Sequence, residues 1–178
     1  MTGCQDNTVN DDRILVVVNR QNSQQPQQLY RDLRKRGVRY IHFVPGVEFD
    51  ANGAPTADSL RAEEWGAFLN TVFTVWVHED IQRIKVQVFE ETLNQWCGRK
   101  GRAEQPEISL SAECQACDLV RFCGGGAPEH RDARGKSMLC KGYRAFFNYS
   151  APYMRVMRDL IKQHRSPMEL MALLRQSV

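Results

Sequence analysis

Four cysteines close together in the second half of the chain are the residues best suited to carry chemistry. They follow the pattern Cys114-x-x-Cys117-x5-Cys123-x16-Cys140. A C-x-x-C pair on a turn can direct two thiolates at one metal, and two later cysteines complete a four-sulfur site. Both Zn²⁺ and a [4Fe–4S] cluster accept four thiolates. Glycines at positions 124–126 directly follow Cys123, and they would let the backbone approach a bulky cluster closely.

The other candidate ligands are weaker, and no catalytic residue is predicted. Four unrelated reduced thiols are the alternative to a metal site, but this density of cysteine is unusual for a protein of the reducing cytoplasm. Cys4 and Cys97 are expected to be free thiols. His130 and His164 each stand beside an arginine, which is more typical of surface histidines than of ligands. No nucleophile–base pair, paired carboxylates or phosphate-binding loop can be singled out.

Composition and charge narrow the class of protein. The 178 residues suffice for one domain with a core, or for a small domain with an appendage. No apolar run approaches the roughly 20 residues of a membrane-spanning helix, and the N-terminus lacks a signal-peptide pattern, so we expect a cytoplasmic protein without membrane contact. Residues 1–98 carry 10 basic and 13 acidic side chains, and residues 99–178 carry 14 and 8. Because the basic residues are scattered, we interpret them as solvated surface and do not expect nucleic acid as a partner.

The first half of the chain alternates between strand and helix patterns. Residues 1–13 are polar and patternless, so we predict a loose tail. The β-branched run 14–18 predicts a strand buried on both faces, and residues 38–44 predict a second strand. Between them, Ser23 is expected to cap a helix that has Pro26 in its first turn.

The alternation continues and defines the expected fold class. Residues 65–77 repeat apolar side chains with a strong helical period. The alternating residues 84–89 predict a third strand, and 90–96 a short helix. Strands that alternate with helices imply parallel pairing through right-handed crossovers. The chain is therefore predicted to be α/β, with three strands that form half of a TIM-type barrel or a small open sheet.

The pattern changes after Gly98. Residues 99–113 are polar and loop-like, and the cysteine-rich stretch follows. A helix is predicted over residues 143–165, where Pro152 must bend or restart it. Residues 166–169, Ser-Pro-Met-Glu, have the pattern of a capping box that opens a last helix.

Several separate motifs resemble those of anaerobic sulfatase-maturating enzymes. They are Val17-Val18-Asn19-Arg20-Gln21-Asn22, residues 39–45 (RYIHFVP), residues 64–69 (EWGAFL), residues 86–89 (VQVF), residues 123–131 (CGGGAPEHR) and residues 139–147 (LCKGYRAFF). The resemblance covers residues 13–165. It implies a partial α/β barrel followed by a SPASM-type domain with two auxiliary [4Fe–4S] clusters. Members of this family oxidise a cysteine or serine of a sulfatase to formylglycine.

The departures from the family are as informative as the likeness. The radical cluster's C-x-x-x-C-x-x-C motif is absent from the 178 residues. Residues 99–113 stand where the family holds three ligands of its first auxiliary cluster, and Ala127 stands at the fourth. The ligands of the second cluster correspond to Cys114, Cys117, Cys123 and Cys140. His42 replaces the glutamine that is usual in the family.

Together these features predict a truncated, catalytically inactive relative of the sulfatase-maturating enzymes that binds one [4Fe–4S] cluster and does not use S-adenosylmethionine. The predicted organisation is a flexible tail (1–13), a partial barrel (14–98), a shortened SPASM-like segment (99–145) and C-terminal helices (146–178). A full-length maturase or a sulfatase is the candidate partner, and the unpaired edges of a half barrel favour self-association. The alternative is a zinc-stabilised binding module or a nucleic-acid-binding regulator.

Overall fold

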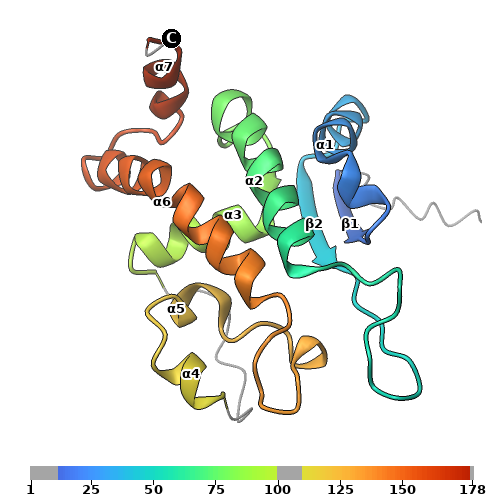
Figure 1. The fold of residues 1–178 in the computed structure, drawn as a ribbon. Helices are drawn as coiled ribbons and strands as arrows, with labels where there is room; N and C mark the ends of the chain where they lie inside the picture. Colours follow the sequence, from blue (N-terminus) through green and yellow to red (C-terminus); the bar gives the residue numbers. More distant parts are fainter. Residues whose placement is uncertain (1–11, 100–109, 177–178) are drawn as a thin grey trace, which may run out of the picture.

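The computed structural model describes residues 12–99 and 110–176 (Figure 1). The first part holds β1 (Arg13–Val18), α1 (Pro26–Lys35), β2 (Tyr40–Pro45), α2 (Ala62–Glu79), β3 (Lys85–Val86) and α3 (Gln87–Trp96). The second part holds α4 (Ala112–Gln115), α5 (Val120–Cys123), α6 (Cys140–Lys162) and α7 (Glu169–Gln176). Short 3-10 turns lie at Asn22–Gln24 and Pro128–His130. The predicted tail falls almost entirely outside the described residues.

The three strands form one parallel sheet in the order β1-β2-β3. This arrangement confirms the predicted α/β class and the parallel pairing. The third strand is much shorter than predicted, because α3 already begins at Gln87. Phe89 and Leu93 are buried at helical spacing, four residues apart. Burial of that helical stripe outweighs the alternating pattern that predicted a strand over 84–89.

The prediction that β1 is buried on both faces is wrong. Ile14 and Val16 pack against the core, whereas Leu15 and Val17 are 59% and 51% exposed. Alternate side chains of a strand point to opposite faces of the sheet, and the face that carries Leu15 and Val17 is exposed. An unbroken β-branched run does not reveal which of its faces is covered.

Two predicted helix caps also differ from the structure. The Ser23 hydroxyl donates to the Arg20 carbonyl at 3.0 Å, while α1 starts at Pro26 after an N-cap at Gln25. The last helix starts at Glu169, two residues later than the predicted capping box requires. There the Ser166 hydroxyl accepts from the Met168 amide at 3.2 Å.

Helix α6 begins at Cys140, three residues before the predicted start, and continues through Pro152 as one element. In Figure 1 its axis changes direction along its length, so the expected bend is present without a restart. Within the described residues, no helix is long and apolar enough to cross a membrane.

The core lies where α2 packs between the sheet and α6. Trp65, Phe68, Phe73 and Trp76 of α2 are all almost fully buried, as the helical period predicts. The Phe73 ring meets Phe89 edge-on, with centroids 5.1 Å apart. The same ring meets Phe146 of α6 at 5.8 Å. One aromatic cluster therefore joins α2 and α3 to α6, the helix that follows the cysteine segment.

Helices α2 and α6 approach each other backbone to backbone at two glycines. A Cβ atom on Gly142 would lie 2.2 Å from the Ala62 carbonyl oxygen, and one on Gly66 would lie 3.0 Å from the Gly142 Cα. The contact needs glycine for its lack of a side chain. Since α6 starts at Cys140, this crossing also determines where that thiol sits.

Replacing Gly142 by alanine should therefore destabilise the protein. By helix propensity alone, alanine is more favourable than glycine by about 1 kcal/mol. Its Cβ would, however, clash with the Ala62 carbonyl oxygen, and a backbone oxygen cannot move aside as a flexible side chain can. We expect a net loss of about 1–3 kcal/mol in the free energy of unfolding, measured by denaturant titration. Asn148→Ala, an exposed change on the same helix, serves as the control. A Gly142→Ala protein as stable as the parent would rule out the close crossing.

Candidate metal centre

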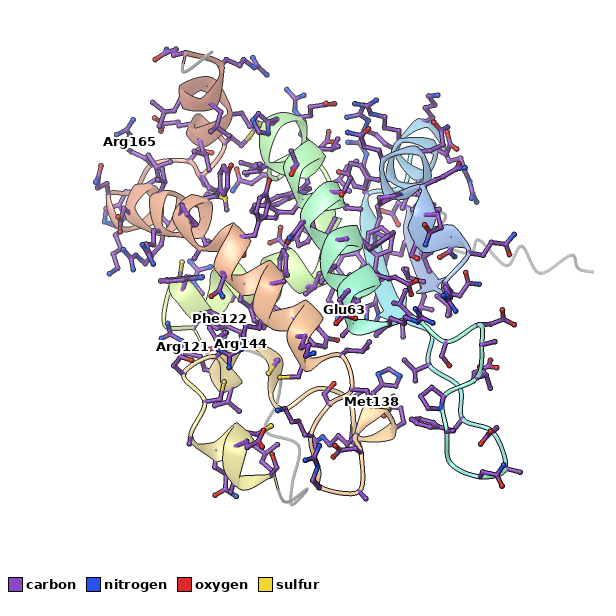
Figure 2. All side chains as sticks on the ribbon, in the orientation of Figure 1. Glu63, Arg121, Phe122, Met138, Arg144 and Arg165 are labelled. Carbon is purple, nitrogen blue, oxygen red and sulfur yellow. The ribbon has the colours of Figure 1, made fainter. Side chains whose placement is uncertain are left out.

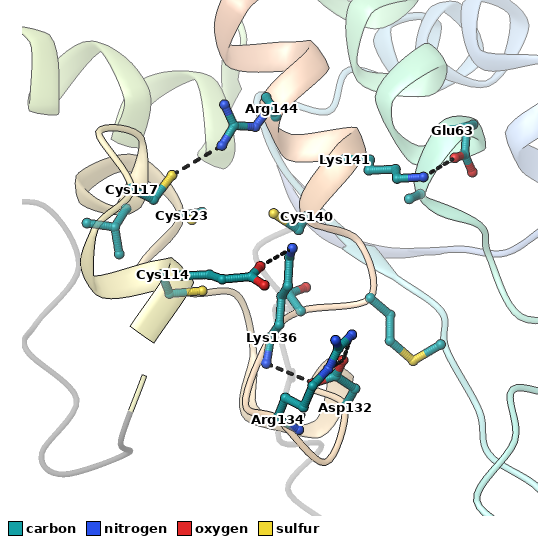
Figure 3. Close-up of a pocket in the computed structure, with 15 residues that line it drawn as sticks. Glu63, Cys114, Cys117, Cys123, Asp132, Arg134, Lys136, Cys140, Lys141 and Arg144 are labelled. Carbon is teal, nitrogen blue, oxygen red and sulfur yellow. Dashed lines mark hydrogen bonds and ion pairs between the residues drawn. The ribbon is translucent and has the colours of Figure 1, made fainter. Parts of the chain in front are cut away.

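The four predicted cysteines line a single cavity of about 500 Å³ (Figure 3). Cys114 lies on α4, Cys123 ends α5 and Cys140 starts α6, while Cys117 lies in the turn after α4. All four are free thiols. Cys97 is also free but does not line this cavity, and Cys4 is outside the described residues. The structure thus brings together the four residues that the sequence singled out.

Short-range hydrogen bonds shape the C-x-x-C pair. The Ser111 hydroxyl caps α4 by accepting from the Cys114 amide at 3.2 Å. One turn later, the Cys117 amide donates to the Cys114 carbonyl at 3.1 Å. The two thiols therefore belong to one tight helical turn, where residues three apart lie on the same side.

A glycine turn and an arginine hold the third cysteine. Residues 124, 125 and 126 all have left-handed backbone, with φ of 58°, 79° and 73°, which only glycine adopts readily. Arg131 donates from Nε to the carbonyl of residue 125 at 3.2 Å, and from Nη2 to those of residues 124 and 126 at 3.3 and 2.8 Å. One guanidinium thus satisfies three consecutive carbonyls directly after Cys123. Its Nη1 atom is buried without a hydrogen-bond partner among the described residues.

Basic side chains gather around the thiols. Arg144 of α6 donates from Nη2 to the Cys117 Sγ at 3.5 Å, and Lys136 forms an ion pair with Glu113. Burial raises the pKa of the Cys123 thiol; the Gly125 amide lowers that pKa, and the other three cysteines raise it. The neighbouring cysteines thus oppose ionisation of Cys123, and a cation bound between the sulfurs would offset this effect.

The spacing of the thiols differs from that of a closed single-ion site. Across residues 12–99 and 110–176, no group of three or more His, Cys, Asp or Glu side chains is arranged to hold one metal ion. A zinc ion would need all its sulfurs about 2.3 Å from one point. The four thiols instead lie among the residues that line a wider cavity of about 500 Å³.

The two histidines considered as ligands have different environments. His164 is exposed, as predicted. His130 is only 5% exposed, so its assignment to the surface is wrong, and burial lowers its pKa. It lines a second cavity of about 230 Å³ that also touches His42, Ala127 and Cys123. Ala127 therefore lies beside the cysteine site without facing its cavity.

Sequence reasoning missed the basic residues that surround the thiols. Arg131 follows Cys123 by eight positions and Arg144 follows Cys140 by four. The second spacing is one helical turn and so was a usable signal. The first was not, because Arg131 reaches the glycine carbonyls only after the turn at Pro128–His130 folds the chain back.

Comparisons with known proteins give a consistent picture. No protein-family model matches the chain. Protein YidF of Escherichia coli K12, described as uncharacterized, is 47% identical over 175 residues, which cover 98% of this chain and all of YidF. A serine-type anaerobic sulfatase-maturating enzyme of Bacteroides thetaiotaomicron is 26% identical over 90% of this chain and 57% of its own length. The corresponding enzyme of Klebsiella pneumoniae is 45% identical over 53 residues.

Solved structures show the same fold. Native anSMEcpe with bound AdoMet and Cp18Cys peptide superposes with a TM-score of 0.67 at 17% sequence identity. The match covers 84% of this chain and 58% of that one, and hexahistidine-tagged anSMEcpe with bound AdoMet gives 0.66. The chain thus spans little more than half the length of the maturases it matches. The resemblance deduced from the motifs is confirmed at the level of fold.

Loss of the Arg131 clamp should expose Cys123. Arg131→Gln removes the donor to three carbonyls, which should destabilise the turn by about 1–3 kcal/mol and raise its open population roughly tenfold. The measurement is the alkylation rate of each thiol in metal-free protein, followed by mass spectrometry. Arg134→Gln is the control, because Arg134 is exposed and its side chain bonds Asp132 rather than the glycine carbonyls. Unchanged Cys123 alkylation in Arg131→Gln would contradict the assigned role.

Proposed function

Since the chain belongs to the family of YidF and is related to the anaerobic sulfatase-maturating enzymes, we propose that it is a non-radical member of that group that holds one [4Fe–4S] cluster. Cys114, Cys117, Cys123 and Cys140 are the proposed ligands. The observation that carries the proposal is the convergence of these four thiols on one cavity. They come from three helices and a turn, so local sequence alone does not account for their meeting.

The size of the cavity supports a cluster over zinc. Four thiolates around a single ion would close tightly on it, whereas a [4Fe–4S] cluster is itself a bulky body held at its corners. The cavity that the four cysteines share with other lining residues has a volume of about 500 Å³, which leaves room for a cluster. Zinc is the second candidate, because the donor set of four sulfurs accepts either metal.

The surrounding residues suit an anionic cluster. Arg144 donates to the Cys117 sulfur. Lys136, Arg134 and Lys141 also line the cavity, where each is paired with a carboxylate, of Glu113, Asp132 and Glu63 respectively. Hydrogen bonds and positive charge near cluster sulfurs stabilise the more negative, reduced state. A bound cluster would supply one-electron transfer. The protein's part is to orient four thiolates and to hold the loop that carries them.

The cysteine motif that holds a radical cluster is absent from these 178 residues. S-adenosylmethionine cleavage needs a cluster with three cysteine ligands and an open iron, and the cofactors supply that chemistry. The 178 residues hold no C-x-x-x-C-x-x-C motif. We therefore assign the chain an accessory role beside a full-length maturase or a sulfatase. The exposed Leu15 and Val17 on the edge strand support contact with such a partner or with a second copy.

The metal assignment makes a direct prediction. After anaerobic reconstitution, the parent should bind about four iron atoms per chain, measured by elemental analysis. Cys117→Ser should lose most of this iron, because it removes one ligand of the site. Cys97→Ser should keep all of it, since Cys97 lies outside the cavity. Full iron in Cys117→Ser, or equal losses in both variants, would overturn the assignment. About one zinc per chain in anaerobically purified protein would favour the zinc site instead.

Reconstituted protein should not cleave S-adenosylmethionine. With excess reductant, we expect no 5′-deoxyadenosine above a protein-free blank, measured by liquid chromatography. A full-length maturase assayed in parallel controls for the reductant. Sustained formation of 5′-deoxyadenosine by the purified chain would show that the accessory role is wrong, and it would leave the ligand assignment to be judged separately by the iron content.

A further inference from the structure

Three arginines surround the ring of Trp96 at the end of α3. The guanidinium carbons of Arg121, Arg155 and Arg158 lie 5.5, 5.5 and 5.7 Å from its centroid. Arg121 comes from α5, and the other two come from α6. All three guanidinium carbons lie within 5.7 Å of the same ring centroid, so any two of them are at most twice 5.7 Å apart. We call this group the Trp96 patch.

Among the described residues, the positive charge of the patch is only partly compensated. Arg158 pairs with Asp159 at 2.8 Å, whereas neither Arg121 nor Arg155 forms an ion pair with a described residue, and both are exposed. Cation–π attraction to Trp96 offsets some of the repulsion, at roughly 0.5–1 kcal/mol for each exposed contact. The positive charge that remains on Arg121 and Arg155 favours a bound anion.

The covered ring indicates which anion fits. Phe122 packs against Trp96 with centroids 5.6 Å apart, and the guanidinium groups lie over the same ring. A nucleic-acid base would need a free aromatic face for stacking, and here the ring already has these neighbours. Carboxylates need only the outward N–H groups of the arginines, which match them in bidentate geometry.

We propose that the Trp96 patch is a docking surface for an acidic peptide segment of a partner protein. Arg121 and Phe122, labelled in Figure 2, belong to α5 and lie on the side of the molecule that carries the cysteine segment. α5 itself ends at Cys123, so a bound segment would lie next to the element that carries this thiol. The surface needs no metal and therefore does not depend on the proposed cluster.

Tryptophan fluorescence can report binding at this surface. Trp65 and Trp76 are each 1% exposed, whereas Trp96 is partly exposed and lies under the arginines. A hexaglutamate peptide should change its emission on titration at low salt, and added salt should weaken the binding. Hexaglutamine is the uncharged control peptide.

Variants identify the residues responsible. Arg121→Gln/Arg155→Gln should weaken hexaglutamate binding about tenfold or more. Arg36→Gln/Arg83→Gln removes the same charge from two exposed positions outside the patch and should leave binding nearly unchanged. Arg121→Lys/Arg155→Lys keeps the charge without the bidentate fork and should give an intermediate affinity. Binding retained by this lysine variant would show that the glutamine variant loses affinity through loss of charge and not through misfolding.

Three results would overturn the proposal. The first is no hexaglutamate binding to the parent protein. The second is an equal loss of binding in the two glutamine double variants, which would indicate only the overall charge. The third is tighter binding of an oligothymidylate probe that depends on Arg121 and Arg155, which would make the patch a nucleic-acid surface.

Discussion

The close crossing of α2 and α6 is the contact on which the rest of the structure depends. Gly66 and Gly142 let the two backbones meet, and no side chain larger than hydrogen fits beside the Ala62 carbonyl. On one side of the crossing, α2 buries its aromatic stripe against the sheet. On the other, α6 carries Cys140 at its first residue and Arg144 one turn later. This one packing contact thus fixes the position of the thiol site relative to the sheet.

The cysteine segment packs against the core through Leu119 and Phe122, and polar interactions hold much of the rest. Cys114 is the only hydrophobic residue of α4 and α5 that is buried. The turn after Cys123 is held by one guanidinium that spans three carbonyls. Such a segment gains stability when its thiolates share a cation, because metal binding is coupled to folding where the apolar core is small.

The sheet half has the opposite character. Its helices cover one face with a dense core, while Leu15 and Val17 remain exposed on an edge strand. An uncovered apolar face on a strand of a parallel sheet is unusual, because such sheets are normally buried on both faces. The maturases that share this fold are longer than the present chain. The edge strand and the Trp96 patch are therefore two separate surfaces, one apolar and one cationic, that suit different contacts.

Sequence by itself determined the features that rest on local or periodic patterns. The order of strands and helices and the buried stripe of α2 can be predicted from the period of apolar side chains. The four cysteines can be singled out from residue type and spacing. Only the tertiary structure decided which face of β1 is covered, at which residue β3 ends and α3 begins, and whether His130 is buried. These outcomes depend on residues that are distant in the sequence, and a local pattern contains no information about them. Arg131 shows the limit most clearly, because its role exists only once the chain folds back and aims three carbonyls at one guanidinium.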